Sequence, residues 1–150
     1  MKVLVTGANG FIAKNLIVRL TEEKDFEVIR LLRSDDESQL NTFVKQSDFI
    51  FHLAGENRPK LIEDFDKNNA QLTSKLCNAI KASGRKIPII FSSSTQANLD
   101  NPYGLSKKSA EKVLERFSLE NENPVKIFRL PGVFGKWCKP NYNSVVATFC

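Results

Sequence analysis

Short apolar runs alternate with longer segments of helical periodicity along the 150 residues. The runs are rich in Val, Ile, Leu and Phe, and their length suits strands that are buried on both faces. They predict five strands, at Lys2–Thr6, Glu27–Leu32, Phe49–Leu53, Ile87–Phe91 and Val125–Leu130. Between them, apolar positions at helical spacing predict helices at Gly10–Thr21, Asp35–Gln46, Asp64–Ser83 and Tyr103–Glu120.

This alternation predicts one domain over residues 1–150 with an α/β fold. We expect a Rossmann-like doubly wound parallel sheet of about five strands with helices on both faces. The segment between the second and third runs has room for one helix but hardly for another strand, so the expected strand order is 2-1-3-4-5. Ligands bind such sheets at the carboxyl ends of the strands.

Charge and composition narrow the classes of partner. The chain has 41% hydrophobic residues, and 22 Lys and Arg against 17 Asp and Glu give a net charge of +5. This excess favours anionic ligands such as phosphates, whereas the scattered basic residues do not predict nucleic-acid binding. No run could span a bilayer, and Met1 leads directly into "KVLVTG" without a signal-peptide pattern, so we expect a cytoplasmic protein without a membrane partner. The three cysteines lack metal-ligand spacing, and no metal site is expected.

The first predicted strand runs into "TGANGFIA", which predicts a phosphate-binding turn. Gly7 would allow the chain to turn sharply, Gly10 would let backbone N–H groups approach a pyrophosphate, and Ala13 would let the helix pack closely on the strand. Asn9, Phe11 and Ile12 complete the turn and open the helix. An ordinary glycine turn is the alternative, but the strand–turn–helix context favours dinucleotide binding.

The end of the second predicted strand bears on the choice of cofactor. A domain that binds NAD usually has an acidic residue there for the ribose 2′-hydroxyl, but this chain has Leu32 and Arg33. The Arg33 guanidinium suits a 2′-phosphate, so NADPH is expected rather than NADH; a surface arginine is the alternative. Asp35 and Asp36 follow slightly too late and are expected to begin the next helix.

Candidate catalytic residues follow the fourth predicted strand. Tyr103 and Lys107 in "YGLSK" are four residues apart and share a helix face. A free tyrosine has a pKa of about 10, and a nearby ammonium lowers it towards the range in which Tyr103 could exchange a proton with a carbonyl or alcohol oxygen. Ser92, Ser93 and Ser94 lie just upstream, at the expected strand end. A lone YxxxK occurs by chance in many helices, but the upstream serines and the phosphate turn favour an active site.

Taken together, these motifs resemble the nucleotide-sugar branch of the extended short-chain dehydrogenase/reductase family, which includes the NAD-dependent epimerases and dehydratases. The resemblance covers the whole chain and implies a catalytic set of Ser94, Tyr103 and Lys107, with Ser93 as the fallback serine. It implies cofactor contacts from the phosphate turn, from "HLAG", from Asn69 and from "RLPGVFG". The residues expected at the cofactor are Gly7, Asn9, Gly10, Phe11, Ile12, Arg33, Leu53, Ala54, Gly55, Asn69, Ser92, Tyr103, Lys107, Leu130, Pro131 and Val133. His52, the one histidine, is expected to be structural.

The segments "HLAGENRP", "SSSTQANLDNPYGLSK" and "GKWCKPNYNSVVATFC" are similar to the capsular polysaccharide reductases of the L-fucosamine pathway. That resemblance implies NADPH-dependent reduction of the C4 ketone of a UDP-linked 2-acetamido-2,6-dideoxy-4-keto-hexose. Ser94, Lys139, Asn141 and Tyr142 are the candidates for the UDP-sugar side. Thr95 and Gln96 stand where related dehydratases carry an Asp-Glu pair, which favours simple hydride transfer.

The same family continues into a sugar-binding subdomain and a C-terminal metal-binding cupin domain, which these 150 residues do not contain. This leaves open two alternatives: an NADP-binding module that is inactive because it is truncated, and another sugar-nucleotide epimerase or dehydratase. A homodimer is one option for its assembly.

Overall fold

The computed structural model describes residues 1–57, 65, 67–141 and 145–149. Within these residues, five strands, two short helical segments and five α-helices follow one another. The strands are β1 (Lys2–Thr6), β2 (Glu27–Leu31), β3 (Phe49–His52), β4 (Ile89–Ser94) and β5 (Val125–Leu130). The α-helices are α1 (Phe11–Glu22), α2 (Glu37–Gln46), α4 (Leu72–Ser83), α5 (Pro102–Asn121) and α6 (Val145–Phe149); the short segments are the π-helix η1 (Lys67–Gln71) and the 3-10 helix η2 (Thr95–Asn98).

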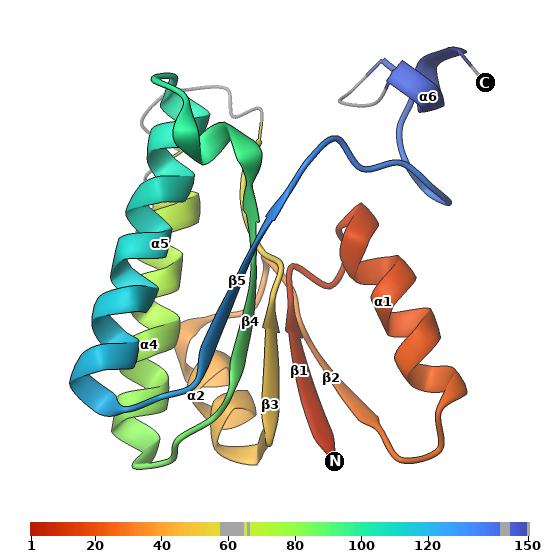
Figure 1. The fold of residues 1–150 in the computed structure, drawn as a ribbon. Helices are drawn as coiled ribbons and strands as arrows, with labels where there is room; N and C mark the ends of the chain where they lie inside the picture. The colour runs from red at the N-terminus through yellow and green to blue at the C-terminus, as the bar shows by residue number, and fades with distance from the viewer. Residues whose placement is uncertain (58–64, 66, 142–144, 150) are drawn as a thin grey trace.

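All five strands run parallel in the order β2-β1-β3-β4-β5. This confirms the predicted α/β sheet and its strand order. The carboxyl ends of the strands therefore meet at one edge, at the top of Figure 1. The phosphate turn, the loop after β3 and the start of α5 all lie at this edge.

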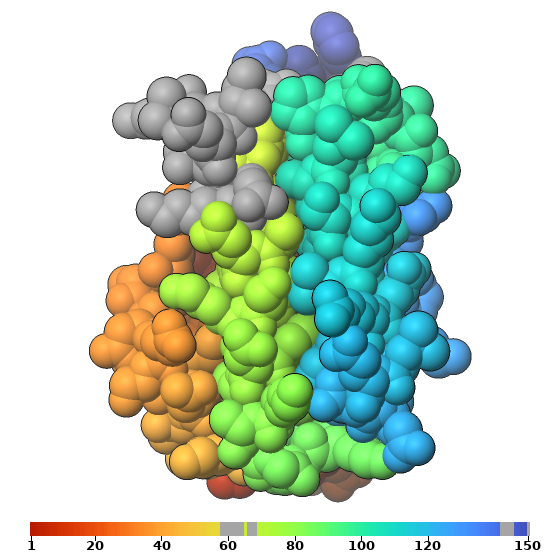
Figure 2. Space-filling model, turned by 90° about the vertical axis from the view of Figure 1, so that its left-hand side faces the viewer, coloured from red at the N-terminus to blue at the C-terminus, as the bar shows by residue number. Residues whose placement is uncertain are grey.

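Helices cover the two faces of the sheet unequally. Helices α2, α4 and α5 pack on one face and bury a core around Leu4, Ile50 and Phe91 from the strands. Figure 2 looks onto this face and shows the three helices side by side. On the other face, α1 is the one helix of the described residues that packs against Val3 and Val5. Figure 1 shows α1 beside β1 and β2, with the chain after β5 rising above it towards α6.

Capping side chains fix where α2 and α5 begin. Asp36 caps α2, and its side chain and that of Gln39 satisfy each other's backbone N–H groups. Asn101 caps α5 by accepting from the backbone N–H of Gly104 at 2.8 Å, and Pro102 follows at the first helical position. These caps place Tyr103 in the first turn of α5, at the carboxyl edge of the sheet.

Two predicted boundaries were wrong in an informative way. Strand β4 continues to Ser94 rather than ending at Phe91, because Ser92, Ser93 and Ser94 pair with Phe128–Leu130 of β5. The hydroxyls lie on the strand itself, so alternate ones face opposite sides of the sheet. The third predicted helix is not uniform, because a π-helical turn, η1, precedes α4; part of its predicted start, at residues 64 and 66, lies outside the described residues.

No helix in the described part of the chain combines the length and the apolar character needed to cross a membrane.

Candidate active site

The turn after β1 has the geometry of a phosphate cradle. Gly7 has a φ of +66°, which favours glycine, and a Cβ there would lie 2.7 Å from the Cα of Ala54. The Gly10 N–H donates to the Gly7 carbonyl at 2.8 Å, which closes the turn, and α1 begins at the next residue. The helix N-terminus brings partial positive charge and unpaired N–H groups to this point. The residues present therefore fit the pyrophosphate of a dinucleotide.

Two cavities open on the two sides of this turn. One, of about 510 Å³, is lined by the turn, the three serines of β4, Tyr103, Lys107 and the segment after β5. The other, of about 440 Å³, is lined by the turn, Arg33, the start of α2 and the loop after β3. Gly7, Asn9, Gly10, Leu53, Gly55 and Glu56 line both. This arrangement suits a ligand with two halves joined by a pyrophosphate.

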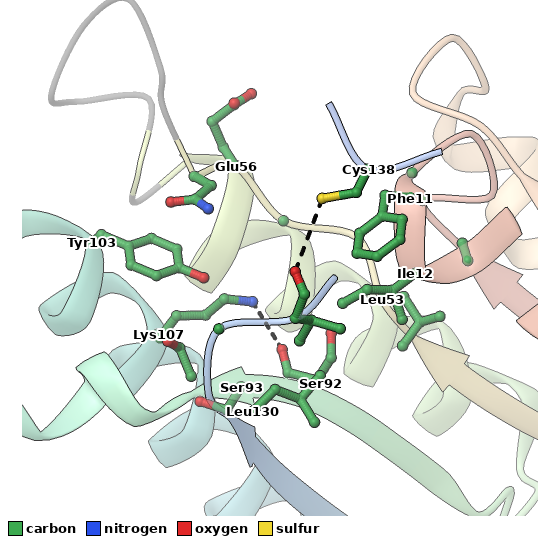
Figure 3. Close-up of a pocket in the computed structure, with 18 of the residues that line it drawn as sticks. Phe11, Ile12, Leu53, Glu56, Ser92, Ser93, Tyr103, Lys107, Leu130 and Cys138 are labelled. Carbon is green, nitrogen blue, oxygen red and sulfur yellow. Dashed lines mark hydrogen bonds between the residues drawn. The ribbon is translucent and has the colours of Figure 1, made fainter. Parts of the chain in front are cut away.

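Tyr103 and Lys107 reach into the larger cavity from successive turns of α5. Figure 3 shows the tyrosine hydroxyl and the lysine ammonium turned into the same space, opposite Phe11 and Ile12 of α1. Lys107 is 5% exposed, donates to the backbone carbonyl of Ser92 at 2.9 Å and lies 4.9 Å from the centre of the Phe91 ring. The ring of Tyr103 packs against Phe65, with 6.0 Å between the ring centres. The side chains of the predicted acid–base pair thus share one partly enclosed pocket.

Burial sets the ionisation of Lys107. It lowers the pKa of the ammonium to about 8, and the negative charge of Glu111 opposes that effect. Glu111 lies one turn further along α5 and is itself 2% exposed. Burial alone raises the pKa of Glu111, but hydrogen bonds from Arg129 and Ser93, with help from nearby positive charge, leave it below its usual range. A buried carboxylate therefore stays ionised beside the lysine.

The structure gives the adjacent serines different hydrogen-bond partners. The Ser93 hydroxyl donates to Glu111 at 2.5 Å, so this side chain faces α5. The Ser94 side chain lies on the alternate side, and its hydroxyl accepts from the Gln96 N–H at 3.2 Å. Both serines line the larger cavity. Of the two, Ser94 is the one whose proton is not committed to Glu111, which favours Ser94 over Ser93 as the serine that faces a substrate.

A buried chain of hydrogen bonds links the first strand to α5 through His52. The Thr73 hydroxyl donates to the Asn69 carbonyl, so it accepts from His52 Nε2 at 2.9 Å. The other ring nitrogen then accepts from the Thr6 hydroxyl at 2.8 Å, while that hydroxyl accepts from the Ala54 N–H. Burial, reinforced by the charge of Lys107, lowers the pKa of His52 to about 3, so the neutral ring fits this chain. This buried position, with both ring nitrogens hydrogen-bonded, fits the structural role expected of His52.

Asn69 carries the same network to helix α5. Its carboxamide accepts from the Glu56 N–H at 3.0 Å and donates to the Glu56 carbonyl at 3.2 Å. It also donates to the Ser106 hydroxyl at 2.8 Å, and that hydroxyl donates to the Tyr103 carbonyl at 2.7 Å. Asn69 therefore ties the loop after β3 to the turn that carries Tyr103.

The structure brings most of the predicted site residues together. Those that line one or both cavities are Gly7, Asn9, Gly10, Phe11, Ile12, Arg33, Leu53, Ala54, Gly55, Ser92, Ser93, Ser94, Tyr103, Lys107, Leu130, Pro131, Val133 and Lys139. Asn69 is buried and lines neither cavity. Asn141 lines neither cavity, and its backbone N–H donates to Thr148. Tyr142 lies outside the described residues.

Sequence reasoning missed several residues that shape this site. Glu111 stands four residues after Lys107, and that spacing could have indicated an electrostatic partner. Ser106, Thr6 and Thr73 carried no signal, because isolated hydroxyl residues are common in any helix or strand. Glu56 lies within the "HLAGENRP" segment, but no role was expected of it.

The residues that the structure describes contain no group of three or more His, Cys, Asp or Glu arranged to hold a metal ion.

A family model for the NAD dependent epimerase/dehydratase family matches residues 3–150, and the chain belongs to this family. A curated relative, the UDP-2-acetamido-2,6-beta-L-arabino-hexul-4-ose reductase of Pseudomonas aeruginosa, is 52% identical over 150 residues, which are all of this chain and 40% of the relative. A GDP-6-deoxy-D-talose 4-dehydrogenase of Aggregatibacter actinomycetemcomitans is 39% identical over 87 residues, which are 53% of this chain and 27% of that protein.

Solved structures agree with this assignment. The capsular polysaccharide assembling protein CapF of Staphylococcus aureus superposes with a TM-score of 0.87 at 43% identity, over all of this chain and 41% of CapF. A UDP-glucuronic acid 4-epimerase of Bacillus cereus, solved with NAD, has a TM-score of 0.80 at 22% identity over 90% of this chain and 58% of the epimerase, and shows the shared fold. The chain thus spans about two fifths of the length of the reductase and of CapF.

Proposed function

We propose that this chain is the cofactor-binding and catalytic part of an NADPH-dependent reductase of nucleotide sugars. The reaction is reduction of the C4 ketone of a UDP-linked 2-acetamido-2,6-dideoxy-4-keto-hexose. The observation that carries this proposal is the shared cavity, in which Tyr103 and the buried Lys107 face the phosphate turn of α1. The 52% identical relative, whose name describes a reductase of a UDP-linked hexul-4-ose, supports the substrate class.

The side chains of the cavity suit carbonyl reduction. A bound nicotinamide cofactor supplies the hydride to the carbonyl carbon. Tyr103 donates the proton that the carbonyl oxygen takes up, and the Ser94 hydroxyl donates a hydrogen bond to the same oxygen. The Lys107 ammonium stabilises the phenolate that is left on Tyr103. Thr95 and Gln96, which follow Ser94, do not ionise, so the site lacks there the extra acid and base that elimination of water needs.

Arg33 is the basis for the choice of NADPH. Its guanidinium lines the smaller cavity next to the end of β2, where a carboxylate would serve the free ribose hydroxyl of NADH. Asp35 and Asp36 stand nearby, but Asp35 accepts from the Leu32 N–H at 2.7 Å and Asp36 caps α2. Arginine is therefore the charged residue at this end best placed for a ligand phosphate.

The central test is Tyr103→Phe in the full-length protein. Ketone reduction, followed as loss of NADPH absorbance with the UDP-4-keto sugar, should fall by at least about a hundredfold, because a general acid contributes about 10²–10⁴-fold. Affinity for NADPH, measured by fluorescence titration, should stay nearly unchanged. Near-normal turnover would reject the assignment of Tyr103.

Two alternatives make different predictions in the same assay. A 4-epimerase consumes no net cofactor, so stoichiometric oxidation of NADPH distinguishes a reductase from it. A binding module that is inactive because it is truncated would titrate NADPH but show no turnover in these 150 residues, with activity recovered in the longer protein. The UDP-sugar contacts of Lys139, Asn141 and Tyr142, the cytoplasmic location and the homodimer stay predictions.

A further inference from the structure

Arg33, the residue proposed to select NADPH, is paired with a carboxylate from another part of the chain. Its Nη1 lies 2.9 Å from Oε2 of Glu56, which is 23 residues away in the sequence. Glu56 belongs to the loop after β3, whereas Arg33 follows β2. Both side chains line the smaller cavity, so the ion pair lies at the end of the site where the 2′-phosphate would bind.

Glu56 is the better anchored partner of this pair. Asn69 holds its backbone N–H and its carbonyl with two hydrogen bonds, and its side chain is 19% exposed against 80% for Arg33. Figure 3 shows the Glu56 carboxylate turned away from Tyr103 and Lys107. The fixed loop therefore presents a negative charge to the cofactor's adenosine side rather than to the reacting carbonyl.

The other carboxylates that line this cavity have partners of their own. Asp35 accepts from the Leu32 N–H, Asp36 caps α2, and Glu37 lies 3.5 Å from Lys75. Within the described part of the chain, Glu56 is thus the carboxylate that competes for Arg33. A phosphate that binds Arg33 must therefore displace the Glu56 carboxylate or bind close to it.

We propose that Glu56 is a specificity-determining residue that weakens the preference for NADPH set by Arg33. The inference rests on the proposed function, in which Arg33 binds the 2′-phosphate. Binding of that phosphate requires Arg33 to exchange the Glu56 carboxylate for phosphate oxygens, with the displaced negative charge still close by. A cofactor with a free 2′-hydroxyl requires no such exchange. Glu56 therefore raises the dissociation constant of NADPH and leaves that of NADH almost unchanged.

The test compares Glu56→Gln with the parent protein by fluorescence titration of NADPH and NADH at low salt. The substitution removes the charge and keeps the shape and the backbone anchored by Asn69. The dissociation constant of NADPH should fall about two- to fivefold, the range expected for a solvent-exposed ion pair, and that of NADH should not change. Raising the salt concentration should shrink the gain, because exposed charges are screened.

Two further variants make the result specific. Glu37→Gln removes a charge from the same cavity without touching Arg33 and should leave the ratio of the two dissociation constants unchanged. In an Arg33→Ala background, Glu56→Gln should no longer alter that ratio. A Glu56→Gln protein with an unchanged ratio overturns the role of Glu56 alone, whereas an Arg33→Ala protein that binds NADPH as tightly as the parent contradicts the proposed cofactor choice itself.

Discussion

Arg129 of β5 binds the buried Glu111 carboxylate of α5 through two of its nitrogen donors. Its Nε lies 2.9 Å from Oε1 and its Nη2 lies 2.6 Å from Oε2, while Ser93 donates to the same carboxylate from β4. Arg129 also donates to Asn98 of η2 at 2.7 Å. Four elements around Lys107 are thus joined through Arg129 and the Glu111 carboxylate, and the charge of that carboxylate reaches Lys107 one turn away.

Glu111→Gln should move the alkaline limb of the activity profile. Lys107 is charged below its pKa of about 8 and loses its charge as the pH rises through that value, so ketone reduction should decline above about pH 8. Glu111 raises the pKa of Lys107, so its neutral replacement should shift this limb to lower pH. The measurement is the pH dependence of kcat in the full-length protein.

The matched control for that experiment is Glu115→Gln. It makes the same charge change one turn further along α5, at an exposed position, and should leave the limb in place. Thermal unfolding of both variants shows whether a loss of packing contributes to the change in activity. If Glu111→Gln folds and its limb does not move, Glu111 has no electrostatic role at Lys107.

Alanine substitutions at Ser93 and Ser94 should have opposite signatures. Ser94→Ala should lower kcat for ketone reduction by about 10²-fold or more, as loss of a donor to a developing oxyanion does, with little effect on stability. Ser93→Ala removes a hydrogen bond to a buried charge and should cost about 1.5–3 kcal/mol in the free energy of unfolding, with a smaller effect on kcat. Urea unfolding and steady-state rates of the two proteins measure these effects. A larger loss of kcat in Ser93→Ala than in Ser94→Ala would make Ser93, and not Ser94, the serine that binds the carbonyl oxygen.

Much of the fold could be predicted because local and global signals agree. The five apolar runs are short and rich in residues that favour strands, and the intervening segments have helical periodicity. The segment between the second and third runs is too short for a further strand, which is how the sequence shows that a strand is absent there. Strands β1 and β5 match their predicted bounds. The end of β4 was wrong because serine is typical of turns, whereas in the fold Ser92, Ser93 and Ser94 gain ladder hydrogen bonds from β5.

The candidate site was predictable where its motifs are contiguous and less so where it depends on tertiary contacts. The phosphate turn and the Tyr103–Lys107 spacing are local patterns. The Arg33–Glu56 pair joins two loops that the sequence leaves 23 residues apart, and only the sheet order brings them together. The same holds for the partners of His52: the predicted strand order places β1 beside β3, but no sequence pattern shows that Thr6 and Thr73 reach the His52 ring.

Gly7→Ala should weaken both folding and cofactor binding. The positive φ alone costs about 1–2 kcal/mol for a residue with a Cβ, and the 2.7 Å approach to Ala54 adds to it. Gly84→Ala is a matched control, because Gly84 has a φ of +67°, a Cβ added there would meet nothing within 4 Å, and it lies at the end of α4, remote from the phosphate turn. Urea unfolding should show a loss in both variants and a larger one in Gly7→Ala. NADPH titration should show weakened binding in Gly7→Ala alone. Equal NADPH affinities in the two variants would contradict the role of the Gly7 turn in binding the cofactor's pyrophosphate.

His52 should make the protein less stable in acid. Its pKa is lowered to about 3 in the fold, against about 6.5 in an unfolded chain, so the unfolded state binds more protons between these values. Above about pH 6.5, His52 is neutral in both states and does not lower the free energy of unfolding. As the pH falls towards 3, His52 takes up a proton in the unfolded state only, and the free energy of unfolding falls with a slope that approaches about 1.4 kcal/mol per pH unit.

Replacing His52 by Asn isolates this contribution, since carboxylates such as Glu111 titrate in both proteins. The variant should be less stable than the parent at pH 7.5, by about 1–3 kcal/mol, because a buried partner of Thr6 and Thr73 is lost. The difference in the free energy of unfolding between variant and parent should narrow from pH 6.5 down to pH 4.5, because keeping the imidazole neutral costs the parent stability in that range. Urea unfolding at four pH values measures the difference in the free energy of unfolding between the two proteins. If that free energy depends on pH in the same way in both, His52 is not held neutral by the hydrogen bonds that link Thr6 to Asn69.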